Sequence, residues 1–282
     1  MTDRTDKRSF ARTSNLGGQT PPVCRFGLAT RGNTHLDPTD VHRAVDAGVN
    51  YLNWCAHPDG MSRAIAELSS RQREQVVVAM QFFARSADDA GRELEAALRT
   101  LGTDYVDVIT FYYVEHEAEW NQIAGPGGAL EGLQPFCEQG TVRRIGMTTH
   151  QRPLAAQVAR SGRLDLLMLR YNAAHRGAET EVFPTTRELG MPVVAFTGLR
   201  WGALLEPTPN DPPEFRPPPA REWYRFVLAQ PAVAVALMAP NGADELNANL
   251  AILNDWHPPS PEQMNAMRAH GDRVCQNAGN FP

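Results

Sequence analysis

The sequence predicts an α/β fold of the (β/α)8 barrel type from three features: its length, its short apolar runs and the helical patterns between them. Barrels of this type typically need about 250 residues, and this chain has 282, of which 42% are hydrophobic. Most of the apolar runs are continuous rather than alternating, as expected for parallel strands that are covered on both faces. The runs are residues 24–30, 50–54, 75–81, 105–112, 141–147, 164–171, 192–197 and 232–239.

Helical patterns alternate with these runs: seven lie between the strands and an eighth follows the last one. The first pattern stops at Gly48, a residue type that commonly ends helices. Ser86, three residues before Asp89, is typical of a capped helix start. Ser260 followed by Pro261 predicts an extra C-terminal helix, because proline is favoured at the first helical position. Strands that alternate with helices in this way favour a parallel barrel.

We expect a single domain, a (β/α)8 TIM barrel over residues 23–282 that includes the extra C-terminal helix. Residues 1–22 are polar and rich in Arg, Thr, Gly and Pro, which predicts a loose tail or a short hairpin. The proline-rich stretch 206–219 follows the seventh strand and predicts a long loop. The sequence shows no internal repeat and no composition change of the kind that marks a domain linker.

Composition and charge exclude several classes of protein. The net charge of −5 and the lack of a basic cluster argue against a nucleic-acid partner. No apolar run approaches the roughly 20 residues needed to span a bilayer, and residues 1–15 lack the apolar stretch of a signal peptide. The cysteines form no CxxC pair, so we expect a reduced, cytoplasmic protein without a zinc ribbon, an iron–sulfur cluster or a disulfide framework. They are Cys24, Cys55, Cys137 and Cys275.

Lysine is nearly missing from the chain. Of the 27 Lys and Arg residues, only Lys7 is a lysine, and it lies in the polar N-terminal segment. Schiff-base enzymes, pyridoxal enzymes and phosphate-loop NTPases all need a lysine amine at the ligand. Since Lys7 precedes the predicted barrel, we exclude these three classes.

Six short segments follow one another along the chain: RFGLAT (25–30), AGVNYL (47–52), LGTDYVD (101–107), GTVRRIG (140–146), RYN (170–172) and VAFTGL (194–199). In this order they resemble the aldo-keto reductase superfamily, and the resemblance covers about residues 23–257. The resemblance implies a (β/α)8 barrel that reduces carbonyl compounds with bound NADPH. It also implies a set of catalytic residues whose positions can be found in this sequence.

The family's reaction uses an aspartate, a tyrosine, a lysine and a histidine, and this chain departs from that set at every matching position. Asn53 stands for the aspartate, Gln81 for the lysine and Tyr112 for the histidine, while the tyrosine position falls near His57. Without the charged aspartate–lysine pair, a phenol would not become acidic near neutral pH. Tyr112 is therefore expected to act as a hydrogen-bond donor or weak acid, and Asn53 and Gln81 to orient a carbonyl. The catalytic candidates are Tyr112, Asn53, Gln81 and His57.

Two classes of function stay open on these residues. The first is a divergent enzyme, oxidoreductase-like by resemblance, that acts on a small carbonyl or hydroxyl compound without the standard Asp–Tyr–Lys–His mechanism. The second is a non-catalytic, ligand- or nucleotide-binding pseudoenzyme, or a non-redox lyase, isomerase or hydratase on the same barrel. Both have a small molecule as their partner, and the sequence leaves the oligomeric state open.

The resemblance also implies a site for a nicotinamide nucleotide, NAD or NADP. Phe196 matches an aromatic residue that stacks on nicotinamide, and Thr148 and Thr149 match the positions that hold its carboxamide. Gly242 stands where the family usually has a basic residue for the 2′-phosphate, so selectivity for NADPH is not expected. Arg200 offers two alternatives, a replacement contact to a phosphate or packing beside Trp201. The residues expected to bind a nucleotide are Thr148, Thr149, Phe196, Thr197, Leu199, Asn241 and Asn249.

Four of the eight histidines follow predicted strands, at the end where barrel active sites lie. They are His57, His116, His150 and His175. Metal barrels usually place their ligands on the strands themselves, whereas three of these histidines lie about four residues beyond. No carboxylate triad accompanies them, so we predict separate loop histidines and no metal site.

Two arginines flank the predicted pocket after the sixth strand. Arg170 and Arg176 could each hold a substrate carboxylate through a bidentate contact. We expect Arg176 to pair instead with Glu179 or Glu181, because both acids lie on the helix that follows.

Overall fold

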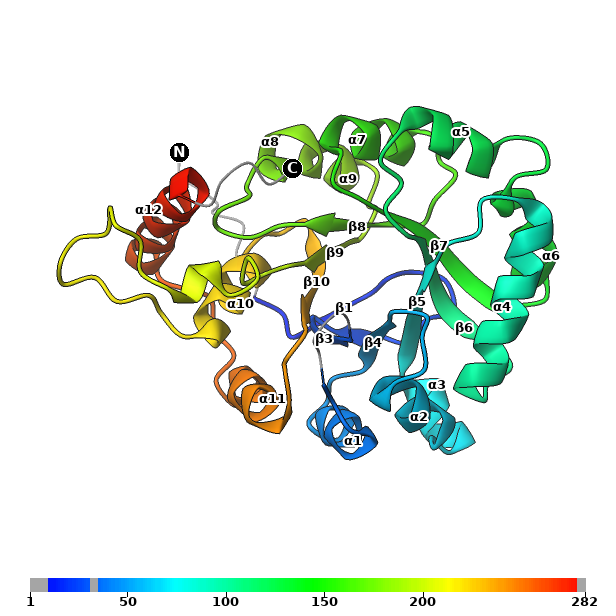
Figure 1. The fold of residues 1–282 in the computed structure, drawn as a ribbon, viewed down its shortest axis with the longest axis horizontal. Helices are drawn as coiled ribbons and strands as arrows, with labels where there is room; N and C mark the ends of the chain where they lie inside the picture. The colour runs from blue at the N-terminus through cyan, green and yellow to red at the C-terminus, as the bar shows by residue number, and fades with distance from the viewer. Residues whose placement is uncertain (1–9, 31–34, 278–282) are drawn as a thin grey trace, which may run out of the picture.

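The fold is a closed barrel of parallel strands. The computed structural model describes residues 10–30 and 35–277; Lys7 lies outside them. Within these residues eight parallel strands close in the order β10-β3-β4-β5-β6-β7-β8-β9 (Figure 1). The predicted fold class is thus confirmed, and each strand falls at its predicted run. The strands are β3 (Phe26–Ala29), β4 (Tyr51–Trp54), β5 (Val77–Phe82), β6 (Val106–Phe111), β7 (Val142–Thr149), β8 (Leu166–Arg170), β9 (Val193–Phe196) and β10 (Val233–Met238).

Helices surround the barrel, and three connections hold two helices where the sequence predicted a single pattern. At α4 the hydroxyl of Ser86 accepts from the Asp89 amide at 3.3 Å, and at α12 that of Ser260 accepts from the Gln263 amide at 3.2 Å, as predicted. The helices are α1 (Pro38–Asp46), α2 (Gly60–Ala66), α3 (Ser70–Gln75), α4 (Ala87–Leu101), α5 (Glu117–Ala124), α6 (Ala129–Glu138), α7 (Arg152–Arg160), α8 (Ala178–Glu181), α9 (Phe183–Glu188), α10 (Ala220–Leu228), α11 (Ala243–Leu250) and α12 (Pro261–Asn277), with short 3-10 turns at Ala203–Leu205 and Ala251–Asn254.

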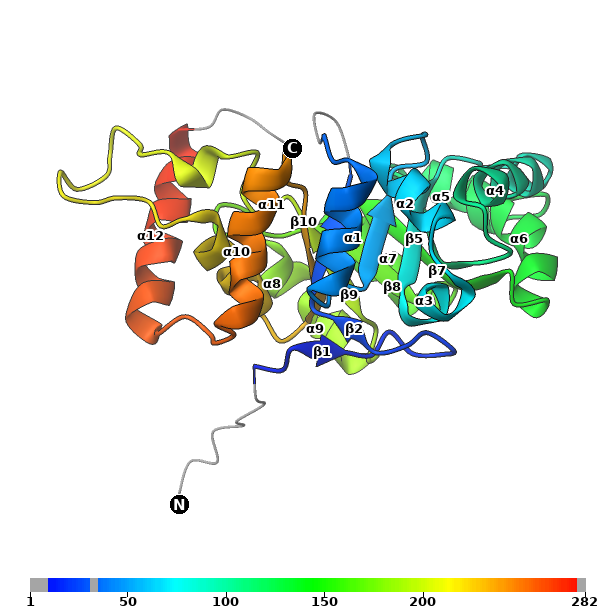
Figure 2. The same ribbon diagram turned by 90° about the horizontal axis from the view of Figure 1, so that it is seen from below.

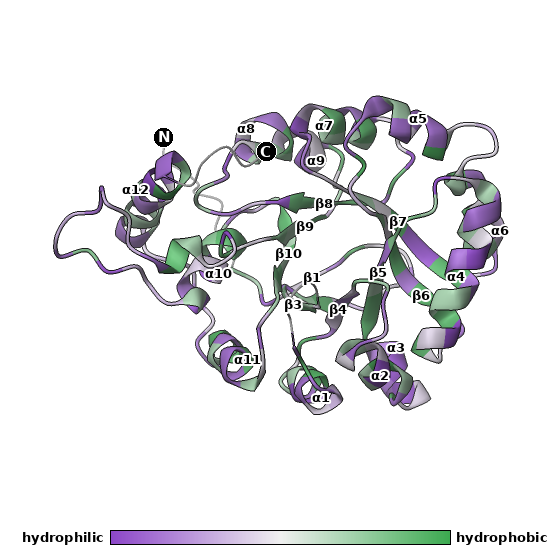
Figure 3. Ribbon diagram, in the orientation of Figure 1, coloured by the Kyte–Doolittle hydropathy of each residue, from purple (hydrophilic) through white to green (hydrophobic). Residues whose placement is uncertain are grey.

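Side chains alternate between two apolar clusters along each strand. On β4, Leu52 and Trp54 face the helices, whereas Tyr51 faces the barrel interior. The interior cluster also holds Met168 and Val194 from β8 and β9. Figure 3 shows the apolar strands inside a ring of helices whose outer surfaces are largely polar. Because the strands are covered on both sides, their sequences read as continuous apolar runs.

An N-terminal hairpin covers one end of the barrel (Figure 2). Strand β1 (Thr13–Ser14) pairs antiparallel with β2 (Val23–Cys24), which leads directly into β3. The turn passes through Gly17, whose φ of 84° lies in the left-handed region that glycine tolerates. Leu16 and Val23 are buried and join the interior cluster. The hairpin therefore covers, with apolar side chains, the end of the barrel where the strands begin.

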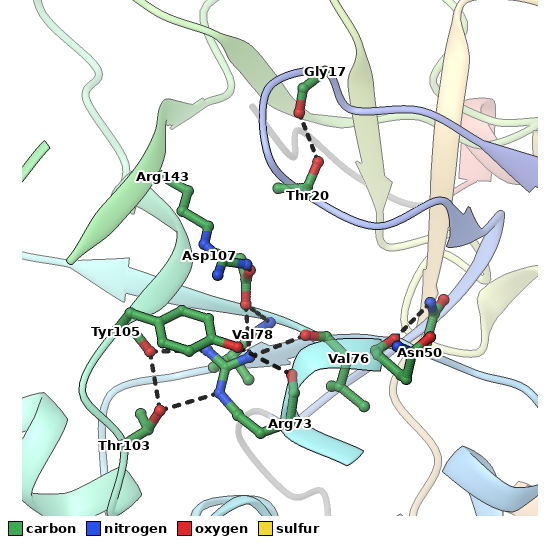
Figure 4. A network of polar contacts seen from close by, with 11 residues as sticks. Gly17, Thr20, Asn50, Arg73, Val76, Val78, Thr103, Tyr105, Asp107 and Arg143 are labelled. Atoms are coloured by element: carbon green, nitrogen blue, oxygen red, sulfur yellow. Dashed lines mark hydrogen bonds and ion pairs between the residues drawn. The ribbon is translucent and has the colours of Figure 1, made fainter. Parts of the chain in front are cut away.

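A charged network lies at this same end (Figure 4). The carboxylate of Asp107, at the start of β6, is fully buried and receives Arg73 Nη1 at 2.9 Å, Arg143 Nη1 at 2.7 Å and the Val78 amide at 2.9 Å. The two guanidinium carbons lie 3.9 and 4.0 Å from the ring centre of Tyr105, between them. Each charge of the network thus has a partner.

The long loop predicted at 206–219 is held by the C-terminal helix α12. Buried Asp211 accepts from His270 Nδ1 at 2.9 Å and from Arg273 Nε at 2.5 Å. The ring of His270 lies 4.8 Å from that of Phe215 in the same loop. In Figure 1 this loop and α12 stand together at one side of the barrel.

Candidate functional site

The site lies at the barrel mouth, where the strands end and polar side chains face inward. Four of these residues follow members of the interior cluster by two along their strands, and Thr148 lies next to Met147, which belongs to the outer cluster, so strand alternation directs all five into the barrel. All of them are at least nine-tenths buried. They are Asn53 on β4, Gln81 on β5, Thr148 on β7, Arg170 on β8 and Phe196 on β9. The sequence placed the same five at strand ends.

Several polar atoms inside the barrel have no hydrogen-bond partner among the described residues. They are Oδ1 and Nδ2 of Asn53, Oγ1 of Thr148 and the hydroxyl of Tyr51. Thr149 differs, because its Oγ1 accepts from the Gln151 amide at 3.0 Å. A buried amide or hydroxyl without a partner costs stability, so such groups in a native protein usually meet a ligand or water. Tyr51 begins β4, whereas Asn53 and Thr148 lie near the strand ends, so the unpartnered atoms of these two residues are the ones that a polar molecule at the mouth can meet.

The four predicted catalytic residues are not gathered in one place. Asn53 and Gln81 lie on neighbouring strands and face the interior. Tyr112 follows β6 directly; its ring centre lies 4.1 Å from that of Tyr113. His57 is exposed on the turn after β4, where its backbone carbonyl accepts from the indole of Trp54 at 2.7 Å. Its side chain thus lies at the surface, away from the buried amides.

Tyr113 has a larger part in the mouth than the sequence suggested. Its φ of 43° lies in the left-handed region, which is strained for a tyrosine. This backbone turn carries the ring to 4.5 Å from His150 and 6.3 Å from Phe196, measured between ring centres. Only the aromatic pair at the end of a strand could have pointed to it. Tyr113, His150 and Phe196 form one aromatic wall of the mouth.

A carboxylate and an imidazole meet beside this wall. Glu115 Oε1 lies 3.1 Å from His150 Nδ1 and accepts the His150 amide at 2.9 Å, while its Oε2 accepts from Gln151 at 3.1 Å. Burial opposes ionisation of Glu115, but the hydrogen bonds from His150 and Gln151 outweigh it and hold the Glu115 pKa below its ordinary value. A charged Glu115 favours the tautomer of His150 with a proton on Nδ1, which leaves Nε2 able to exchange a proton. Nothing in the sequence links these residues, which lie 35 positions apart.

Positive charge gathers next to the pair. Burial, followed by the charges of Arg200 and Arg152, lowers the pKa of Arg170. Burial and the arginines, with Arg170 first, lower the pKa of His175 to about 4, so this imidazole is neutral at pH 7. His175 Nδ1 lies 3.3 Å from Asn172 Oδ1, which fixes the ring.

Arg176 does not pair with either acid that the sequence offered. Its Nη2 instead contacts Asp272 on α12 at 2.6 Å. Glu179 is taken by Arg268, also on α12, at 2.9 Å, and Glu181 by Arg152 at 2.8 Å. The prediction was wrong because α12 lies beside α8 in the folded protein. Its charged residues, about 90 positions away in the sequence, pair with Arg176 and Glu179.

The predicted nucleotide residues fall into two groups. Phe196 and Thr148 face the mouth, and half-buried Thr197 and Leu199 begin the turn after β9, where Thr197 has a φ of 58°. Arg200, in the same turn, is buried with its guanidinium carbon 5.1 Å from the ring centre of Trp201.

The second group lies at α11. Asn249 is buried on that helix, whereas Asn241 is exposed and its amide donates to Glu245 Oε2 at 2.8 Å. Asp244 and Glu245 make the first turn of α11 acidic. An aromatic face and an unpaired hydroxyl fit a nicotinamide amide, but the acidic turn does not fit an added phosphate.

Other classes of site find no support in the part of the chain that the structure describes. No three histidine, cysteine, aspartate or glutamate side chains there are placed to hold a metal ion. No described helix has the length and apolar character needed to cross a membrane.

The comparisons with known proteins agree with this architecture. Over 92% of its length the chain matches the aldo-keto reductase AKR11C1 of Bacillus halodurans, with TM-scores of 0.73 for the apo form and 0.71 for the holo form. Sequence identity is 17% and 18%, and 95% and 96% of those chains are covered. At such identity the match shows the fold alone.

The matches to relatives by sequence cover a smaller part of the chain than the structural match does. The NADH-specific methylglyoxal reductase of Escherichia coli K12 is 26% identical over 119 residues, 42% of this chain and 36% of the relative. The uncharacterized oxidoreductase YrpG of Bacillus subtilis 168 is 25% identical over 209 residues, 64% of this chain and 61% of the relative. The chain thus spans about a third and three fifths of these relatives. A sequence model of the Aldo/keto reductase family matches residues 33–222, more than half of the chain. The chain belongs to the aldo/keto reductase family.

Proposed function

We propose that the chain is an oxidoreductase that interconverts a small carbonyl compound and its alcohol with NAD(H), and that Glu115 and His150 replace the family's usual proton donor. The observation that carries the proposal is the contact of 3.1 Å between Glu115 Oε1 and His150 Nδ1, next to Phe196. A carboxylate that orients an imidazole is a common arrangement for general acid–base catalysis.

Different residues at the mouth would bind the nucleotide and the substrate. Phe196 offers an aromatic face for a nicotinamide ring, and the unpartnered Oγ1 of Thr148 offers a hydrogen bond to its amide. When bound, the nucleotide would donate or accept a hydride. Asn53 Nδ2 is a buried donor without a partner, suited to a substrate carbonyl oxygen.

Proton transfer falls to His150 in this proposal. Glu115 holds the Nδ1 proton, so Nε2 is the atom that gives a proton to the carbonyl oxygen or takes one from the alcohol. The carboxylate of Glu115 lies 3.1 Å from Nδ1, beside the positive charge that the ring carries while Nε2 holds a proton. Tyr113, packed at 4.5 Å against the imidazole, shields one side of the ring from water.

The acidic first turn of α11 favours NADH over NADPH. Asp244 and Glu245 follow Gly242, which stands where the family resemblance implies the 2′-phosphate contact and supplies no cation there. Carboxylates repel a phosphate, whereas they accept a hydrogen bond from a ribose hydroxyl. The name of the E. coli relative, an NADH-specific methylglyoxal reductase, is consistent with this preference and suggests short aldehydes and ketones as first substrates.

Nucleotide binding is the first test. NADH should quench the fluorescence of the exposed Trp201, with a lower dissociation constant than NADPH. Phe196→Ala should weaken NADH binding, whereas the control Leu189→Ala, at an exposed position after α9, should not. Equal affinity for NADH and NADPH would contradict the proposal that the acidic turn of α11 selects NADH. If neither nucleotide binds, the proposed oxidoreductase function is wrong.

Turnover tests the proton carrier. With methylglyoxal and other short aldehydes and ketones, NADH oxidation should fall about 100-fold or more in His150→Gln, at unchanged NADH affinity. The control His257→Gln, on an exposed side chain, should keep full activity. Tyr112→Phe tests the competing candidate: if this variant loses turnover and His150→Gln does not, Tyr112 carries the proton.

A restoration variant tests whether the standard set was lost beyond simple repair. We expect Asn53→Asp combined with Gln81→Lys not to produce strong aldehyde reduction, because the exposed His57 supplies no phenol at the donor position. Strong activity in this double variant would show that His57 or Tyr112 already serves as a competent donor.

A second function rests on the same pair and on Asn53. The pair Glu115–His150 can move a proton without a nucleotide, and Asn53 can polarise a carbonyl, which together suit isomerisation or hydration. Absence of NADH binding together with deuterium exchange next to the carbonyl of hydroxyacetone, measured by NMR, would support this non-redox activity. Absence of both would support a ligand-binding role alone.

A further inference from the structure

Arg170 is a buried cation that lacks the partner expected of one. Its side chain points from the end of β8 into the mouth, and the residue is 9% exposed. No hydrogen bond or ion pair joins its guanidinium to any residue that the structure describes. An uncompensated buried charge is costly, so a cation in such a place usually has a counter-ion.

Three other deeply buried arginines of the described residues each meet an acceptor. Arg73 pairs with Asp107 at 2.9 Å, and Arg225 pairs with Glu222 at 2.6 Å. Arg25 donates to the carbonyl oxygens of residues 228 and 233 at 2.7 and 2.9 Å. Each of these three guanidinium groups thus meets an acceptor, whereas that of Arg170 meets none within the described residues.

The acids near Arg170 already have partners. Glu115 accepts from His150 and Gln151, Glu181 from Arg152, and Glu179 from Arg268 and the hydroxyl of Tyr171. Arg200 and Arg152 add positive charge close enough to act on Arg170. The acids around this position are thus already bonded, and the positive charge of the neighbouring arginines favours an anion from outside.

The space in front of Arg170 limits the size of that anion. The cavity measures about 10 Å³, room for roughly one water molecule. A compact anionic group can therefore reach the guanidinium only from the open side, with the rest of the ligand in the mouth toward Phe196. The lining residues used here are Thr149, His150, Arg152, Arg170 and His175.

We propose that Arg170 binds the carboxylate of a small ligand, with Arg200 adding long-range attraction, so that the ligand of this barrel is a short oxo or hydroxy acid. The planar guanidinium can meet the two carboxylate oxygens with two parallel hydrogen bonds. Neutral His175, fixed through Asn172, borders the same cavity and can add a hydrogen bond. The proposed function enters only in naming the ligand as a substrate, because carboxylate binding itself needs no nucleotide.

Calorimetric titration of the full chain, without nucleotide and at constant ionic strength, tests the site. The probes are pyruvate, lactate and 2-oxoglutarate, with hydroxyacetone as the neutral control. At least one carboxylate should bind at least tenfold more tightly than hydroxyacetone. Arg170→Gln should weaken that carboxylate about tenfold or more, because a hydrogen bond to a charged group is lost. Arg170→Lys should fall between, since the charge stays and the fork is lost.

Two further measurements keep the outcomes apart. Arg99→Gln, on an exposed position of α4, should leave carboxylate affinity unchanged, and the melting temperature of Arg170→Gln without ligand should not fall. Equal carboxylate affinity in wild type and Arg170→Gln, or no carboxylate binding at all, would overturn the proposal. So would a loss of NADH or inorganic phosphate binding in Arg170→Gln without any loss for carboxylates, since the anion would then be a phosphate. Carboxylate binding without NADH binding would leave this site standing and remove the proposed redox function.

Discussion

The two ends of the barrel differ in whether their buried arginine and asparagine side chains have partners within the protein. At the end where strands begin, the buried arginine Arg73 meets Asp107, and the amide of Asn50 makes three hydrogen bonds. At the mouth, the buried arginine Arg170 meets no acid among the residues that the structure describes, and both polar atoms of the Asn53 amide lack partners among them. Both ends belong to one barrel and are built from the same strands.

The difference supports the proposal that one end is built for stability and the other for a ligand. Polar groups that are satisfied within the protein hold strands and hairpin together, and they leave nothing for a second molecule. Polar groups that are buried and unsatisfied lower stability until a ligand or water meets them. Barrel enzymes generally place function at the ends of the strands and stability at their beginnings, and this chain follows that division.

The largest effect should come from breaking the network at the closed end. Asp107→Asn removes the charge that faces Arg73 and Arg143 inside the protein. We expect the free energy of unfolding in urea to fall by about 3–5 kcal/mol, because a buried cation is left uncompensated. NADH and carboxylate binding by the remaining folded protein should not change.

The matched control is the exposed pair between Asp272 and Arg176. Asp272→Asn should cost no more than about 1 kcal/mol, since solvent screens this contact. Equal losses in both variants would mean that the network of Asp107 contributes no more than a surface pair.

A pair of identical substitutions compares the two ends directly. Asn50→Leu loses the bonds to the Cys24 amide and to the carbonyls of Pro22 and Gln75, so we expect a loss of about 1–3 kcal/mol. Asn53→Leu replaces an unsatisfied amide by an apolar group of similar shape and should raise stability by about 1 kcal/mol. Urea unfolding of both variants measures the contrast. A loss of similar size in Asn53→Leu would show that its amide is satisfied within the protein, for instance by bound water.

The smallest effect concerns the pH dependence of stability at the mouth. His175 has a folded pKa of about 4 against an ordinary value of 6.5, lowered first by burial and then by the charges of Arg170, Arg200, Arg152 and His150. Between these two pH values His175 is protonated in the unfolded chain but neutral in the folded protein. The free energy of unfolding should therefore fall as the pH drops from about 6.5 toward 4, with no contribution above that window.

His175→Gln should flatten this part of the curve relative to wild type, as measured by urea unfolding at several pH values. The exposed His257 provides the control, because His257→Gln should keep the wild-type slope in this window. Saturation with a carboxylate should also flatten the slope in wild type, since an anion at Arg170 would ease protonation of His175. Parallel curves for His175→Gln and wild type would contradict the depressed pKa.

The sequence predicted the fold more completely than the site. Eight apolar runs gave all eight barrel strands because parallel strands covered on both faces must be apolar along their length. Strand ends were then enough to find Asn53, Gln81 and Phe196. The roles of these residues stay predictions.

What the sequence did not reveal depends on contacts between distant segments. Glu115 and His150 come from the ends of different strands, and only the closed barrel brings them together. The exposure of His57 follows from a turn whose path no residue pattern fixed. Arg170 and Arg176 looked alike in sequence, and their difference lies in α12, which supplies Asp272 to one of them alone.

The contact between α12 and the long loop has a consequence for hydrogen exchange. Asp211 accepts hydrogen bonds from the Thr208 amide, His270 and Arg273, and these bonds hold its pKa below the ordinary value although burial opposes ionisation. Residues 206–219 have little regular structure of their own, so the anchor at Asp211 ties their protection to that of α12. Local opening of one should then expose the amides of the other, and the two segments should exchange with a common opening free energy. The C-terminal helix would in this way set how often the loop beside the mouth opens.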